Sequence, residues 1–159
     1  MSAAAAQQPQ VVLVLVGLPG AGKSTLCAAL ERCCPGRFVR VCQDLLKSRP
    51  KCEKATREAL AAGRSAVIDR TNLDAKQRES WVAIATAAGA TAQAVLLDVT
   101  PALCMERVKT RTEHYGSQAK PFIVNMMKGR LRAPTAEEGF SQVETVSTPQ
   151  DVAEFVTRV

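Results

Sequence analysis

A glycine-rich turn that ends in a lysine and a hydroxyl residue is the part of the sequence best suited to chemistry. The residues G-L-P-G-A-G-K-S, from Gly17 to Ser24, match the spacing G-x-x-x-x-G-K-[ST]. Glycines in this spacing let successive backbone N–H groups converge on one anion, and the lysine adds a positive charge to the β- and γ-phosphates. We therefore expect ATP to bind here, through Gly17, Leu18, Pro19, Gly20, Ala21, Gly22, Lys23, Ser24 and Thr25.

Two carboxylates follow predicted strands, Asp44 after "RFVRVCQ" and Asp69 at the end of "SAVID". Ligands of open α/β sheets bind beyond the carboxyl ends of the strands, where both residues belong. Asp44 can accept the proton of an acceptor hydroxyl while the γ-phosphoryl group moves onto it, or it can cap a short helix. Asp69 can hold Mg²⁺ together with Ser24, or act only as a structural hydrogen-bond acceptor.

Several cationic and polar side chains are expected near the same edge. Arg107 and Arg111 are four residues apart, so they share one helix face, which either closes over the transferring phosphoryl group or forms a solvated basic surface. Arg70 and Thr71 directly follow the third predicted strand. We expect these two residues on the acceptor side of the site.

Strands and helices that must position these side chains alternate along the chain. Strands are predicted at 11–16, 37–44, 65–69, 92–99 and 141–147, and helices from 24 onward, at 51–62, at 74–88, from 101 onward, at 121–131 and at 149–159. Regular alternation is typical of a doubly wound parallel sheet, here of about five strands with helices on both faces. The polar segment 112–120 interrupts the pattern, and we expect a helical lid over about 107–121.

Composition and length indicate one intracellular domain. A hydrophobic content of 47% in 159 residues excludes a mainly disordered chain. We expect residues 11–159 to form a single domain after a flexible tail at 1–10. The sequence lacks a long apolar run and a basic secretion signal, which predicts a soluble nuclear or cytoplasmic protein without membrane contact. Six cysteines without C-x-x-C pairing predict free thiols rather than disulfides or a zinc site.

The net charge of +6 suggests that a second polyanion binds besides ATP. Aromatic residues make up only 4% of the chain, which argues against a long base-stacking surface. A nucleic acid would therefore be held mainly by charge and a short slot.

Five segments in a fixed order resemble the kinase domain of the polynucleotide 5′-kinase/3′-phosphatase family. They are "GLPGAGKST", a strand-end "QD", "VIDRTNLDAKQR", the pair Arg107 and Arg111, and "RAPTAEEGF". A related kinase-type domain occurs beside aprataxin-like modules in plants. The similarity extends over about 11–146.

This resemblance implies a P-loop kinase fold and transfer of the ATP γ-phosphate to the 5′-hydroxyl end of DNA or RNA, in nucleic-acid end repair or processing. It implies that Asp44 is the general base, that Lys23 and Ser24 contact ATP and Mg²⁺, and that Thr71 and Arg78 lie near the substrate strand. Family members often carry arginine just before the base and a basic residue just after it, where this chain has Gln43 and Lys47. Lys47 is the expected contact to the substrate phosphate.

Other functions fit parts of the pattern. A small-metabolite P-loop kinase, a nucleoside phosphate kinase and a nucleotide-binding module without turnover would share the glycine-rich turn. No D-x-D-x-T phosphatase motif is present, so 3′-end processing would need another domain or chain. We expect a monomer that can be part of a larger multidomain protein.

Overall fold

The computed structural model describes residues 8–115 and 120–159 and contains a five-stranded sheet in which all neighbouring strands are parallel. The strand order is β2-β3-β1-β4-β5. The strands are β1 (Val11–Val16), β2 (Phe38–Cys42), β3 (Ser65–Asp69), β4 (Thr91–Leu97) and β5 (Gln142–Val146). The predicted doubly wound sheet of about five strands is confirmed.

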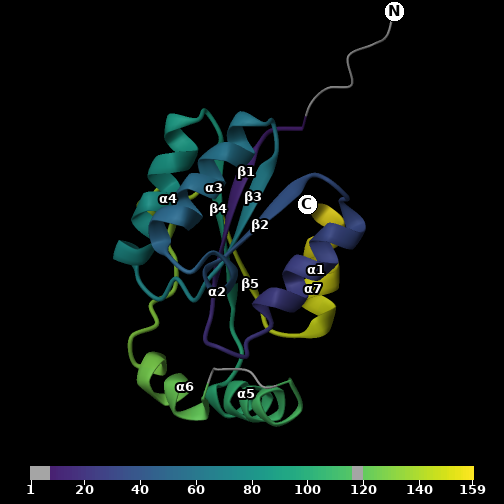
Figure 1. The fold of residues 1–159 in the computed structure, drawn as a ribbon, viewed down its shortest axis with the longest axis vertical. Helices are drawn as coiled ribbons and strands as arrows, with labels where there is room; N and C mark the ends of the chain where they lie inside the picture. The colour runs from purple at the N-terminus through teal and green to yellow at the C-terminus, as the bar shows by residue number, and fades with distance from the viewer. Residues whose placement is uncertain (1–7, 116–119) are drawn as a thin grey trace, which may run out of the picture.

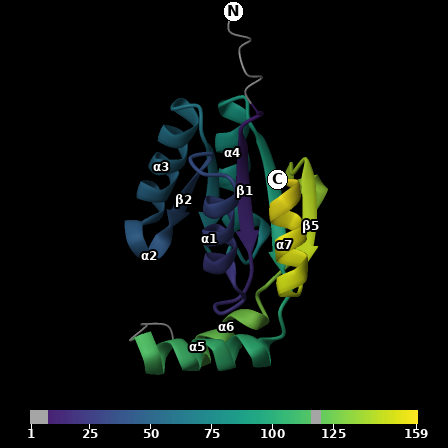
Figure 2. The same ribbon diagram turned by 90° about the vertical axis from the view of Figure 1, so that its right-hand side faces the viewer.

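Helices cover both faces of the sheet and the edge where the strands end (Figure 1). They are α1 (Lys23–Cys33), α2 (Gln43–Leu46), α3 (Arg49–Ala61), α4 (Ala75–Ala87), α5 (Pro101–Tyr115), α6 (Pro121–Lys128), the 3₁₀-helix η1 (Ala136–Glu138) and α7 (Pro149–Arg158). Helices α3 and α4 lie on one face, and α1 and α7 on the other. Figure 2 shows α5 and α6 across the bottom, beyond the carboxyl end of β1.

Strand β1 is the centre of the fold, since every one of its residues is buried. Successive side chains of a strand point to opposite faces. Leu13 and Leu15 accordingly join the hydrophobic cluster beneath α1 and α7, whereas Val14 and Val16 join the cluster beneath α3 and α4. A strand with two apolar faces can only lie inside a sheet covered on both sides.

Helix starts are set by local chemistry. Ser48, Asp74 and Thr148 each accept a hydrogen bond from a backbone N–H of the first turn of α3, α4 and α7, respectively. Such caps satisfy backbone donors that have no partner within the helix. They fix where each helix begins after its strand.

Several boundaries differ from the sequence-based prediction. The second strand ends at Cys42, because the chain turns directly into α2, so Asp44 is helical. Helix α5 extends to Tyr115, so the segment expected as a helical lid is helix up to that residue; residues 116–119 lie outside the described residues. Residues 1–7 of the predicted flexible tail also lie outside the described residues. Gln10, at the end of that tail, is bound to the domain, since its Nε2 donates to the carbonyl oxygens of Leu60 and Arg64.

Within the part of the chain that the structure describes, no helix has both the length and the apolar character needed to cross a membrane.

Candidate active site

The turn after β1 is held in a shape that requires glycine. Gly20 has a φ of +86°, and a Cβ atom there would lie 2.5 Å from the carbonyl oxygen of Cys104 in α5. Gly22 has a φ of +103° and directly precedes α1. Side chains rarely adopt such φ values. The N–H groups of Gly20 and Gly22 donate to no described residue, so an anion at the start of the helix can accept from them.

Lys23 lies beneath this turn rather than in solvent. Its Nζ donates hydrogen bonds of 2.8 Å to the carbonyl oxygens of Gly17 and Leu18. The side chain is 8% exposed, and burial lowers the pKa of Lys23 to about 8. A phosphate in the turn would offer the ammonium group a charged partner in place of these two carbonyls.

The Ser24 hydroxyl and the Asp69 carboxylate, which were expected to hold a metal ion, are in contact. Ser24 Oγ donates to Asp69 Oδ2 over 3.2 Å, and Asp69 is only 7% exposed. The same oxygen accepts from Arg40 Nε at 2.9 Å and from Arg40 Nη2 at 2.6 Å. Sequence reasoning missed Arg40; the available signal was a charged residue within a short apolar strand, β2, that neighbours the strand ending in Asp69.

This pair suits Mg²⁺. A hydroxyl and a carboxylate are oxygen ligands of the kind that Mg²⁺ prefers, and the carboxylate already holds a cation, the guanidinium of Arg40. Among the described residues, no group of three or more histidine, cysteine, aspartate or glutamate side chains could hold a metal ion. Magnesium bound with a nucleotide needs only one or two carboxylates beside the phosphates, so the residues present fit it.

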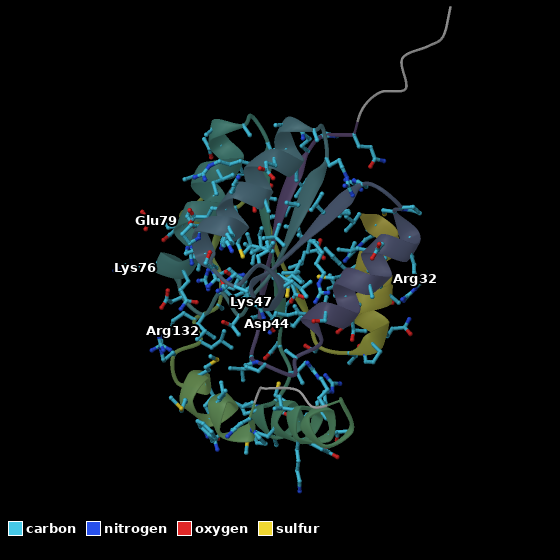
Figure 3. All side chains as sticks on the ribbon, viewed as in Figure 1. Arg32, Asp44, Lys47, Lys76, Glu79 and Arg132 are labelled. Atoms are coloured by element: carbon cyan, nitrogen blue, oxygen red, sulfur yellow. The ribbon has the colours of Figure 1, made fainter. Side chains whose placement is uncertain are left out.

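Asp44 lies in the short helix α2 and is exposed. The caps of the adjacent helices are other residues, Cys42 for α2 and Ser48 for α3, so Asp44 does not cap a helix. Its carboxylate forms no hydrogen bond or ion pair with any described residue. Lys47 ends α2 with a φ of 71° and is also exposed. Figure 3 shows Asp44 and Lys47 close together near the centre of the view, apart from Arg32 at the right.

Arg70 packs against an indole beside a second arginine. Its Cζ lies 5.9 Å from the ring centre of Trp81, and that of Arg49 lies 4.9 Å from the same ring. Arg49 is paired with Glu53, but Nη1 of Arg70 is buried and has no hydrogen-bond partner in the described part of the chain. Burial, followed by the charge of Arg49, lowers the pKa of Arg70. An anion would relieve both the unmade hydrogen bond and the repulsion.

Thr71 connects this side of the sheet to the glycine-rich turn, because its carbonyl oxygen accepts from the N–H of Gly17 at 3.1 Å. The structure thus brings Thr71 to the turn through its backbone.

The structure places Arg78, which was expected near the substrate strand, inside the protein. It is 1% exposed, and each nitrogen of its guanidinium group donates to another part of the chain. Nε and Nη2 pair with Glu138, and Nη1 donates to the carbonyl oxygens of Asn72 and Arg132. Four of the five N–H donors of the guanidinium group are therefore used within the protein, which gives Arg78 a structural role.

Arg107 and Arg111 both reach the glycine-rich turn. Arg107 Nη1 donates to the carbonyl oxygen of Gly20 at 3.3 Å, and the positive charge of Arg111 helps to lower the pKa of Lys23. Both arginines line a cavity of about 680 Å³ between the turn, α1, α5 and the β5–α7 connection. The cavity walls include Thr25, Leu97 and Val146, and this volume suits a nucleotide.

The cavity and Asp44 lie on opposite sides of the turn. The turn follows β1, the central strand, and the cavity lies toward β4 and β5, whereas Asp44 and Arg70 follow β2 and β3. A nucleotide in the cavity would therefore direct its phosphates across the turn toward Asp44.

Comparisons with known proteins agree with this geometry. A family model described as AAA domain matches residues 12–134. The chain is 38% identical over 138 residues to the bifunctional polynucleotide phosphatase/kinase of Schizosaccharomyces pombe, covering 86% of this chain and 33% of that protein. It is 32% identical over 151 residues to the Arabidopsis thaliana protein named transcription factor bHLH140, covering 90% of this chain and 16% of that protein. The chain thus spans about a third or less of these relatives, and the predicted resemblance to polynucleotide kinases is confirmed.

Solved structures share the fold. Kti12 of Chaetomium thermophilum, in complex with ADP-AlF₃, superposes with a TM-score of 0.69 at 17% identity, covering 92% of this chain and 96% of that one. A gluconokinase from Sinorhizobium meliloti gives 0.64 at 19% identity, with 94% and 93% covered. A chain of the Pnkp1/Rnl/Hen1 RNA repair complex gives 0.67 at 22% identity, with 77% and 44% covered. The fold is therefore that of P-loop kinases, which bind nucleotides.

Proposed function

The chain belongs to the AAA domain family, and we propose that it is an ATP-dependent polynucleotide 5′-hydroxyl kinase, which transfers the γ-phosphate of ATP to the 5′-OH end of DNA or RNA. The P-loop kinase fold and the polynucleotide kinase relative support a phosphotransferase. The role in end repair or end processing is part of the same proposal.

The observation that carries the proposal is the position of Asp44. Its carboxylate is exposed and unpaired among the described residues, beside the glycine-rich turn and across it from the nucleotide-sized cavity. An unpaired carboxylate is free to take the proton of an acceptor hydroxyl. An open position suits the end of a long strand, whereas a small metabolite is usually held in an enclosed pocket.

In the proposed reaction, backbone N–H groups of the turn after Gly17 bind the ATP phosphates, and Lys23 exchanges its two loop carbonyls for phosphate oxygens. Asp44 accepts the proton from the 5′-hydroxyl as its oxygen attacks the γ-phosphorus. The bond from that phosphorus to the leaving oxygen then breaks, which releases ADP. Mg²⁺, when bound by Ser24 and Asp69, neutralises charge on the phosphate oxygens.

Arg107 and Arg111 have a supporting role in the proposal. Their charges lie at the turn, where negative charge is spread over the phosphoryl oxygens during transfer. A helical lid that carries such cations would also exclude water from the reacting phosphate.

The substrate strand is proposed to contact Lys47 and Arg70 through its first phosphates. Both lie on the acceptor side, and the buried N–H of Arg70 lacks a partner among the described residues. Contacts of Lys47 and Arg70 with strand phosphates would distinguish a strand from a nucleoside without phosphates.

A small-metabolite kinase is the second candidate, favoured by the fold similarity to the gluconokinase. A panel of acceptors separates the two. Label from γ-labelled ATP should pass to 5′-hydroxyl DNA or RNA oligonucleotides but not to 5′-phosphorylated ones, sugars or nucleoside monophosphates. Lys23→Met should abolish all transfer. Label on a sugar or on a nucleoside monophosphate, with unlabelled oligonucleotides, would replace the proposal with that alternative, and ATP binding without any labelled product would indicate a binding module.

A further inference from the structure

Arg40 occupies the oxygen atoms that a metal ion would use. Its Nη2 lies 2.6 Å from Asp69 Oδ2 and 3.1 Å from Ser24 Oγ, and its Nε lies 2.9 Å from the same carboxylate oxygen. One oxygen of Asp69 therefore accepts three hydrogen bonds, two from Arg40 and one from Ser24.

These contacts conflict with a divalent cation bound directly to Asp69 Oδ2 and Ser24 Oγ. A carboxylate oxygen that already accepts three donors has no lone pair directed at a metal, and a guanidinium group so close would repel one. Asp69 is 7% exposed, so its charge needs a nearby cation. Lys23 supplies part of this compensation, since the charge of Asp69 acts to raise the pKa of Lys23, but Arg40 is the cation that pairs with Asp69 Oδ2. At this oxygen, Arg40 and a metal ion are alternatives.

The guanidinium group of Arg40 can move away from Asp69, because the rest of the Arg40 side chain is not held in place by hydrogen bonds. Its side chain is 41% exposed, and besides Ser24 and Asp69 its guanidinium group contacts two thiols, Cys42 at 3.8 Å and Cys27 through a side-chain hydrogen bond. A released arginine at this place would remain solvated, so its departure costs little burial. By contrast, Asp69 and Ser24 belong to regular elements, since Asp69 ends β3 and Ser24 lies in the first turn of α1.

We propose that Arg40 is an exchangeable cation, which holds Ser24 and Asp69 in place without metal and is displaced when a divalent cation arrives with the nucleotide. This inference rests on the proposed metal-dependent kinase function. Arg40 is thus a positioning residue that sets the metal affinity of the site. A competing internal charge weakens metal binding and keeps the site ordered between turnovers.

The test measures metal binding rather than phosphoryl transfer. Binding of Mn²⁺ with ADP is followed by electron paramagnetic resonance, and the melting temperature is recorded with EDTA or with Mg²⁺. Arg40→Met should bind Mn²⁺ about tenfold or more tightly, as expected when a charged hydrogen-bonding competitor is removed. In EDTA this variant should melt lower than the wild type, and Mg²⁺ should raise its melting temperature more than that of the wild type. Arg40→Lys should fall between the two.

A matched control is Arg158→Met, which removes an arginine paired with Glu144 at 2.7 Å on the distant β5–α7 surface. It should leave Mn²⁺ affinity unchanged. Adding Asp69→Asn to Arg40→Met should abolish the gain. Unchanged or weaker Mn²⁺ affinity in Arg40→Met, or a gain that survives Asp69→Asn, would overturn the proposal. Because no acceptor is present, these outcomes are independent of which hydroxyl group the protein phosphorylates.

Discussion

Arg78 and Glu138 form a two-pronged ion pair inside the protein, with Nε–Oε1 and Nη2–Oε2 distances of 2.7 and 3.1 Å. Arg78 comes from "LDAKQR" and Glu138 from "APTAEEGF", so the pair joins two segments that lie 60 residues apart. The third arm of Arg78 donates to the carbonyl oxygen of Asn72. Asn72 in turn donates to Leu15 of the central strand, so the pair anchors the chain beside the site.

Removing one partner of this pair should be costly. Glu138→Ala should lower the free energy of unfolding by about 3 kcal/mol, because Arg78 would stay buried without its counter-charge. Urea unfolding measures the loss. The matched control is Glu144→Ala, whose partner Arg158 is 63% exposed and which should cost less than about 1 kcal/mol. Equal losses in the two variants would contradict a structural role for the Arg78–Glu138 pair.

The same pair predicts a pH dependence. Burial acts to raise the pKa of Glu138, but hydrogen bonds from Arg78 and Thr135 outweigh it and hold the pKa below its ordinary value of 4.5. A depressed carboxyl pKa stabilises the folded state above 4.5, and this stability is lost as pH falls toward the folded-state pKa. Glu138→Gln should therefore lose less stability than the wild type between pH 5 and 3, measured by thermal unfolding. Parallel curves would show that Glu138 is not the titrating group.

The glycine-rich turn offers a test with an internal control. Gly20→Ala would force a Cβ atom to within 2.5 Å of the Cys104 carbonyl at a φ of +86°. We expect loss of ATP binding and a destabilisation of about 2 kcal/mol or more. Gly129→Ala meets nothing within 4 Å and has a φ of −77°, so it should change stability by less than about 0.5 kcal/mol. Calorimetric ATP titration and thermal unfolding check both.

Normal ATP binding in Gly20→Ala would contradict the assignment of this turn to the phosphates. Loss of binding in Gly129→Ala as well would show that the assay reports general damage.

The fold was predictable because its signals are local. The apolar run of β1, the glycine-rich spacing and the capping residues each act within a few positions of the sequence. The end of β2 was placed two residues late, because a one-turn helix such as α2 leaves no periodicity to detect. Strand β4 ends at Leu97, whereas the prediction extended it to Val99.

Site residues could be predicted from the sequence only where they belong to a local motif or follow a strand. Ser24 and Asp69 meet as expected, since both follow from strand ends at one edge. The roles of Arg40 and Arg78 depend on side-chain contacts 29 and 60 residues away along the chain, which no local pattern reveals. Arginines are mostly exposed, so a fully buried Arg78 was not expected.

Salt should separate strand binding from small-acceptor binding. Affinity for a 5′-hydroxyl oligonucleotide should fall with rising salt, because bound phosphates release counterions, while affinity for a neutral nucleoside should change little. Arg70→Met should lower oligonucleotide affinity and reduce the slope of log affinity against log salt by about one phosphate contact. Fluorescence anisotropy measures both slopes. Equal salt sensitivity for strand and nucleoside would mean that no strand phosphate is bound.

The central claim is that Asp44 is the general base, and single-turnover transfer to a 5′-hydroxyl oligonucleotide by Asp44→Asn tests it most directly. Asp44 is exposed and unpaired among the described residues, so the amide should leave the melting temperature and ATP affinity unchanged. The rate of transfer should fall about a hundredfold or more, the size of a lost general base. Asp98→Asn, an exposed aspartate after β4, should keep the wild-type rate. A rate in Asp44→Asn close to that of the wild type would contradict the account.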